Sequence, residues 1–211
     1  MKKHLQEFTV HAYKGIHNLT LESLNAINIL TGDNNSGKTS VLELLSTIGN
    51  PQDTDAWIRC ARIDGLRIRD RLYFNGFYNM FPIDDGRKEI AYSLVDGDGK
   101  SDEVMLVAEL EETQVSEKEM YRLNGLSRMR SVKQEDEVVD TVCMHLYTYL
   151  NQNKAHEDVI YDFQNILPRN LNKRKPYVKT VYVSPVDHAK SSLNLNGILS
   201  DPELYGEMLS I

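Results

Sequence analysis

The stretch from Gly32 to Thr39 reads G-x-x-x-x-G-K-T, the phosphate-binding P-loop, and it constrains this chain more than any other feature. Glycines at its two ends let the backbone turn tightly, so that successive N–H groups point at phosphate oxygens. Lys38 would reach the β- and γ-phosphates, and the Thr39 hydroxyl would bind Mg²⁺. The sequence therefore predicts a nucleoside triphosphate as ligand. The residues expected to contact it are Gly32, Asn34, Asn35, Ser36, Gly37, Lys38, Thr39 and Ser40.

The flanks of the loop agree with this interpretation. Residues 26–30 form an apolar run that predicts a short buried strand before the loop, and residues 40–48 predict a helix after it. The N-terminal end of that helix would face the phosphates. The alternative is a glycine turn that binds nothing.

Composition limits the remaining possibilities. The 211 residues are 41% hydrophobic, enough for one α/β domain with an insertion or a small second lobe. A net charge of −7 argues against coating nucleic acid by bulk electrostatics. No apolar run approaches the roughly 18 residues that span a bilayer, so we expect no membrane contact and a cytoplasmic location. Cys60 and Cys143 stand alone and predict reduced thiols rather than a disulfide or metal site.

Two strands are predicted before the loop, at residues 5–10 and 16–21, joined by a glycine turn. Tyr13 and Lys14 lie in that turn. They would contact the nucleotide base if the strands fold back over the P-loop. The alternative is an ordinary turn with a half-buried tyrosine.

The first fifty residues resemble a known family. They look like the opening of ABC-type ATPase heads of RecF, SMC and OLD (overcoming-lysogenization-defect) proteins. The segments that carry the resemblance are Phe8, Tyr13-Lys14-Gly15-Ile16, and residues 24–43 with their N-N-S-G-K-T-S loop. The loop is most like that of OLD-like ATPases of bacterial anti-phage defence. The resemblance implies ATP and Mg²⁺ bound between two heads of a homodimer, a nuclease or other effector as partner, and action in phage defence or DNA processing.

The expected fold class is α/β, a P-loop NTPase of the ABC-head type with an antiparallel β-hairpin lobe and a helical insertion. Residues 1–50 would hold the first strands, the P-loop and its helix, and residues 51–175 the hairpin lobe and insertion. Residues 176–211 would hold a return strand and the start of a cut helix. The family's signature helix and Walker B strand are not recognisable, so we expect an incomplete head whose catalytic residues stay unknown.

Within residues 51–175, a helix is predicted from Trp57 and a hairpin from residues 88–95 and 103–110. Glu109–Glu112 imitates a Walker B carboxylate pair but is assigned to the hairpin. Residues 137–150 match helical spacing and predict an amphipathic helix, with His145 as a surface or packing residue. Five arginines suggest a DNA-contacting strip, with a solvated, ion-paired face as the alternative; they are Arg59, Arg62, Arg67, Arg69 and Arg71.

Three functions remain open from the sequence: the ATPase core of an OLD-like or RecF-like protein, a nucleotide-gated interaction module without turnover, and a P-loop kinase or GTPase. A GTPase would need the guanine-binding motif N-K-x-D, which this sequence lacks, and a kinase would not normally carry the long predicted hairpin.

Overall fold

The computed structural model describes residues 5–62, 72–83, 88–125 and 137–165. The chain divides into two compact units, Met1–Lys179 and Thr180–Ile211. All of the described residues belong to the first unit. The return strand and the cut helix predicted within residues 176–211 lie outside the described residues.

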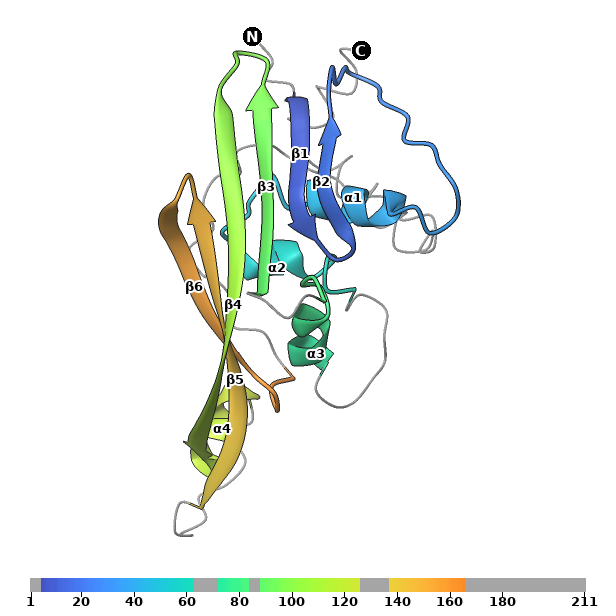
Figure 1. Ribbon diagram of the computed structural model, residues 1–211. Helices are drawn as coiled ribbons and strands as arrows, with labels where there is room; N and C mark the ends of the chain where they lie inside the picture. The colour runs from blue at the N-terminus through green and yellow to red at the C-terminus, as the bar shows by residue number, and fades with distance from the viewer. Residues whose placement is uncertain (1–4, 63–71, 84–87, 126–136, 166–211) are drawn as a thin grey trace, which may run out of the picture. The chain divides into compact units, whose positions relative to one another are not determined.

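The first unit is built on one six-stranded antiparallel sheet, with strand order β2-β1-β3-β4-β5-β6 (Figure 1). Each strand pairs with the next in this order, and every pairing is antiparallel. The strands are β1 (Leu5–Tyr13), β2 (Ile16–Leu21), β3 (Lys88–Asp96), β4 (Ser101–Ser116), β5 (Val138–Leu150) and β6 (Asn153–Tyr161).

Alternating apolar residues correctly predicted both of the early strands and the later hairpin. Tyr13 pairs with Ile16, so β1 and β2 are joined by Lys14 and Gly15 alone. Strands β3 and β4 pair from Lys88–Ala108 to Val95–Ser101. Glu109 and Glu111 lie further along β4 with exposed side chains, as expected for hairpin residues.

The amphipathic helix predicted at residues 137–150 is wrong, because this segment is strand β5. Its buried side chains on the core side alternate, at Met144, Leu146 and Thr148. Valine, threonine and tyrosine favour a pleated surface, and β4 offers a long partner edge. The two-residue turn Asn151-Gln152, with positive φ at both positions, then leads into β6.

Four helices occur in the described segments: α1 (Lys38–Leu45), α2 (Thr54–Trp57), α3 (Leu72–Tyr78) and α4 (Glu117–Leu123). Helix α1 begins two residues before the predicted helix and ends three residues earlier. Helix α2 ends at Trp57, where a helix was predicted to begin. None of the helices in these segments has the length and apolarity needed to cross a bilayer.

The hydrophobic core lies between one face of the sheet and helices α1, α2 and α3. Tyr92 of β3 is its centre: the ring lies 5.4 Å from that of Phe8 and 6.4 Å from that of Trp57, between centroids. Its hydroxyl is hydrogen bonded to Thr47 at 2.9 Å. Helix α1 contributes Val41 and Leu44 to the same core, so burial of these two residues fixes the helix that follows the P-loop.

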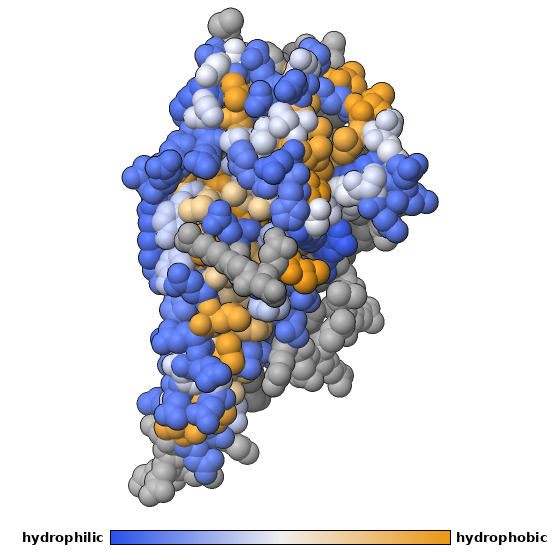
Figure 2. Space-filling view, viewed as in Figure 1, coloured by the Kyte–Doolittle hydropathy of each residue, from blue (hydrophilic) through white to orange (hydrophobic). Residues whose placement is uncertain are grey.

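The strand predicted at residues 26–30 is not formed. The sheet pairs β1 on both sides, and no described strand lies beside this segment. Asn28 instead closes a local turn by accepting a hydrogen bond from the Asn25 backbone N–H at 2.9 Å. Ile27 and Ile29 are each 84% exposed. Figure 2 shows hydrophobic surface at the upper right, where Figure 1 places the connection between β2 and α1.

The turn between β3 and β4 depends on the buried carboxylate of Asp96. Its Oδ1 accepts hydrogen bonds from the backbone N–H groups of Asp98 at 3.0 Å and Lys100 at 2.9 Å. We expect Asp96→Ala to lower the free energy of unfolding by about 1–3 kcal/mol, because both N–H groups lose their acceptor. Urea unfolding measures the change. Asp96→Asn keeps an Oδ1 acceptor and is the matched control; equal stability of the alanine variant and the wild type would contradict this role.

Candidate nucleotide-binding site

The P-loop folds around its own lysine. Lys38 Nζ donates hydrogen bonds to the carbonyl oxygens of Gly32 at 2.8 Å and Asp33 at 2.5 Å, and to Ser36 Oγ at 3.2 Å. The Ser36 N–H also donates to the Asp33 carbonyl, closing a tight turn. The ammonium group is therefore held by three oxygen atoms of the loop itself.

Positive backbone angles give the loop its curvature. Gly32 has φ +152° and Gly37 has φ +87°, and an added Cβ at Gly37 would lie 3.2 Å from Ile16 Cδ1. Asn35 adopts φ +65°, a left-handed conformation that asparagine tolerates better than most residues. Both motif glycines thus occupy backbone conformations that residues with a side chain rarely adopt.

The N-terminus of α1 is open to an anion. Gly37 is its N-cap, so no side chain accepts a hydrogen bond from the first turn, and the first turn contains no acidic residue. The first N–H groups of a helix have no partner within the helix and carry its positive dipole end. Asn34 and Thr39 beside them are exposed. An anion of the phosphate type fits this end of the helix.

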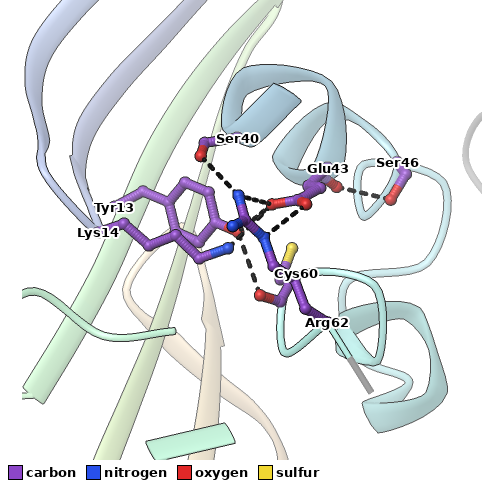
Figure 3. A network of polar contacts seen from close by, with 7 residues as sticks. All are labelled: Tyr13, Lys14, Ser40, Glu43, Ser46, Cys60 and Arg62. Carbon is purple, nitrogen blue, oxygen red and sulfur yellow. Dashed lines mark hydrogen bonds and ion pairs between the residues drawn. The ribbon is translucent and has the colours of Figure 1, made fainter. Parts of the chain in front are cut away.

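One turn further along α1, Glu43 ties the helix to two other segments (Figure 3). Its carboxylate accepts hydrogen bonds from Lys14 Nζ at 2.9 Å, from Arg62 Nε at 2.9 Å and from the Tyr13 hydroxyl at 3.2 Å. Glu43 is 6% exposed, so its charge is held away from water and needs these partners. Arg62 also reaches Ser40 Oγ at 3.4 Å, in the first turn of α1.

Tyr13 and Lys14 do lie beside the helix that follows the P-loop, but their described contacts are with Glu43. The Tyr13 side chain is fully buried, and its hydroxyl also donates to the Cys60 carbonyl oxygen. A β-bulge between Val10 and Ala12 places Tyr13 on the same side of β1 as Phe8 and Val10. Contact with a base stays a prediction for both residues.

Burial governs the protonation of this cluster. It raises the pKa of the Tyr13 hydroxyl well above its ordinary value and raises the pKa of the Cys60 thiol to about 12. It lowers the pKa of Lys14, and the hydrogen bond to Glu43 acts in the opposite direction. Tyr13 and Cys60 are therefore neutral at pH 7.

The arginine strip can be followed only in part. Arg67, Arg69 and Arg71 lie outside the described residues. Arg62 is engaged with Glu43 and Ser40, which favours the ion-paired interpretation at that position. Sequence reasoning missed Glu43, because a glutamate in an amphipathic helix gives no local sign that it will be buried.

The described surface also has a hollow away from the P-loop. Residues 48–52 line one wall, and Leu94, Lys100, Glu103 and Asn151 lie on the others. No residue from Gly32 to Ser40 lines it. The candidate nucleotide site therefore consists of the loop and the helix end, apart from this hollow.

No protein-family model, curated protein or solved structure matches this chain.

The buried thiol and phenol make stability fall at alkaline pH. The folded state keeps the Cys60 proton where the unfolded chain has lost it, so this contribution is complete below about pH 9 and is lost as the pH rises toward 12. The raised pKa of Tyr13 also makes stability fall as the pH rises, whereas the lowered pKa of Lys14 makes it rise. Each raised group contributes a slope of at most about 1.4 kcal/mol per pH unit.

Urea unfolding from about pH 7 to about pH 11 measures this dependence. We expect the free energy of unfolding to decrease above about pH 9, and to decrease less steeply in Cys60→Ala and Tyr13→Phe. A wild-type stability that stays constant or rises over that interval would show that these groups are not buried as described.

Proposed function

We propose that this chain is the ATP-binding part of a P-loop ATPase head of the OLD/RecF-like type, with Mg²⁺ as co-ligand. One observation carries the proposal. The G-x-x-x-x-G-K-T segment combines positive φ at both motif glycines with a lysine ammonium at the loop mouth and an uncapped helix N-terminus directly behind it. A glycine turn without a ligand has no need for all three.

In this proposal the backbone N–H groups from Gly32 to Ser40 bind the phosphates. Lys38 exchanges its carbonyl partners for β- and γ-phosphate oxygens, which are stronger acceptors because they are charged. The exposed Thr39 hydroxyl supplies the Mg²⁺ ligand. Two cationic side chains, Lys14 and Arg62, pair with the single carboxylate of Glu43, and this excess of cationic groups favours a polyanion near α1.

The wider assignment rests on the sequence resemblance. The proposed fold is an ABC-type α/β head with a hairpin lobe, and two such heads would pair through ATP. The proposed partner is a nuclease or other effector. The protein would act in phage defence or on DNA, in the cytoplasm. Phosphoryl transfer to water also needs a group that orients the water and a charge that stabilises the transition state. A nucleotide-gated interaction module without turnover is therefore the alternative, and it shares the same binding site.

Removing the lysine ammonium tests the nucleotide site. We expect Lys38→Ala to weaken MgATP binding by about 10-fold to 100-fold or more, because the loss of charge-assisted bonds leaves only backbone dipoles to compensate the phosphates. Calorimetric titration of the full chain measures the affinity, and urea unfolding shows whether the variant is folded. Lys118→Ala, an exposed lysine of α4, is the matched control. Equal affinity in Lys38→Ala and the wild type would make the loop a structural turn.

The metal ligand is tested at the next residue. We expect Thr39→Ala to bind ATP without Mg²⁺ as the wild type does, but to lose most of the gain in affinity that Mg²⁺ gives. The reason is that only the hydroxyl ligand is removed. Titrations with Mg²⁺ and with excess chelator measure this gain. Thr39→Ser keeps the hydroxyl and should behave as the wild type; a Thr39→Ala variant with full Mg²⁺ dependence would remove Thr39 from the metal site.

A further inference from the structure

The outer face of strands β4, β5 and β6 gathers three kinds of metal-binding side chain. Glu111 of β4 lies directly opposite Cys143 of β5, and His145 follows two residues later on the same face. Glu157 of β6 pairs with Tyr147, one position further along that face. The opposite face of the same strands carries the core residues Met144, Leu146 and Ile160. Regular strand pairing therefore brings these side chains together on rigid backbone.

The distances among them suit a small divalent cation. His145 Nε2 lies 3.1 Å from Glu111 Oε2 and 3.6 Å from Cys143 Sγ. The three ligand atoms all lie within 4.8 Å of one another. In a tetrahedral zinc site, bonds of about 2.0–2.3 Å place neighbouring ligand atoms roughly 3.3–3.8 Å apart. The side chain of Glu111 is 64% exposed, so a small change in its conformation can bring its carboxylate to the distances of a zinc site.

The histidine is oriented as a metal ligand requires. Its ring stacks on Tyr147, with centroids 6.0 Å apart and an interplanar angle of 16°. Nε2 faces Glu111 and Cys143, whereas Nδ1 faces Glu157 Oε1 at 3.6 Å and has no hydrogen-bond partner within the described residues. Ligating histidines typically donate the proton of their other ring nitrogen to a carboxylate. A metal at Nε2 would leave that proton on Nδ1, facing Glu157.

We propose that Glu111 Oε2, Cys143 Sγ and His145 Nε2 bind a Zn²⁺-type divalent cation, with Glu157 as the positioning residue behind the histidine. A thiolate, an imidazole and one carboxylate select zinc and similar borderline metals over Mg²⁺ and Ca²⁺, which prefer oxygen ligands. Three protein ligands leave a fourth position for water or a substrate atom. Binding releases the thiol proton to solvent, and nothing is oxidised or reduced. The expectation that Cys143 is not a metal ligand is replaced by this proposal.

The arrangement has one competing explanation. A protonated His145 has N–H donors on both nitrogens and would bridge Glu111 and Glu157 without any metal. That explanation gives the Cys143 thiol no role. It predicts that zinc binds here no more tightly than to isolated carboxylates on a protein surface. The two explanations therefore differ in a direct binding measurement.

Cobalt(II) titration of the full chain provides that measurement, after chelator treatment under reducing conditions. We expect one equivalent of Co²⁺ to give a near-ultraviolet thiolate-to-cobalt charge-transfer band, and one equivalent of Zn²⁺ to abolish it. Zn²⁺ should also raise the midpoint of thermal unfolding, since it binds only the folded site. Absence of the band, or binding only in large metal excess, would overturn the proposal in favour of the bridging histidine.

Variants separate ligands from neighbours. Cys143→Ser should lose the band, and Glu111→Gln should weaken Zn²⁺ binding by about 10-fold to 100-fold; Glu157→Gln should keep the band with affinity reduced by about 10-fold or more. His156→Gln, on β6 but facing the other side of the sheet, is the matched control and should bind as the wild type. Circular dichroism verifies folding. A band that persists in folded Cys143→Ser would exclude this site.

Discussion

The arrangement around the P-loop depends on the hydrogen bonds and ion pairs that the buried carboxylate of Glu43 accepts. Its charge cannot remain in the interior without partners, and the chain supplies them from the β1–β2 turn and from the turn that ends at Arg62. Lys14 adopts the left-handed conformation, φ +52°, that a two-residue hairpin turn requires, and its ammonium group reaches Glu43 from there. The helix that follows the P-loop is thereby fixed to the sheet at one point by charge and along its length by Val41 and Leu44.

This fixation has a consequence for ligand binding. Because α1 is held against the sheet, its uncapped N-terminus and the loop before it are presented to solvent in one orientation. A phosphate group would then find its N–H donors already placed and would lose less affinity to ordering of the loop. The ligands of the proposed zinc site are likewise held in place before binding, because they lie on the regularly paired strands β4, β5 and β6.

Local patterns predicted those elements whose partners are close in sequence. The β1–β2 and β3–β4 hairpins and the P-loop helix followed from alternation, turn residues and helical spacing. The apolar residues of segment 137–150 fit a helical period and a strand period. The segment is a strand because it pairs along the edge of β4. Residues 26–30 have the composition of a buried strand, but a strand forms only beside a partner, and none is described next to them. The bulge that turns Tyr13 inward and the burial of Glu43 depend on tertiary contacts that no local pattern contains.

The central claim, that the segment from Gly32 to Ser40 binds nucleotide phosphates through its backbone, is tested most directly by hydrogen exchange read by mass spectrometry. Residues 32–36 are exposed without ligand, so saturating MgATP should slow exchange in peptides that span residues 32–41 and leave those of β5 and β6 unchanged. The Lys38→Ala variant should show no such protection at the same concentration. Unchanged exchange in the wild-type loop, with ATP bound or not bound elsewhere, would contradict the account.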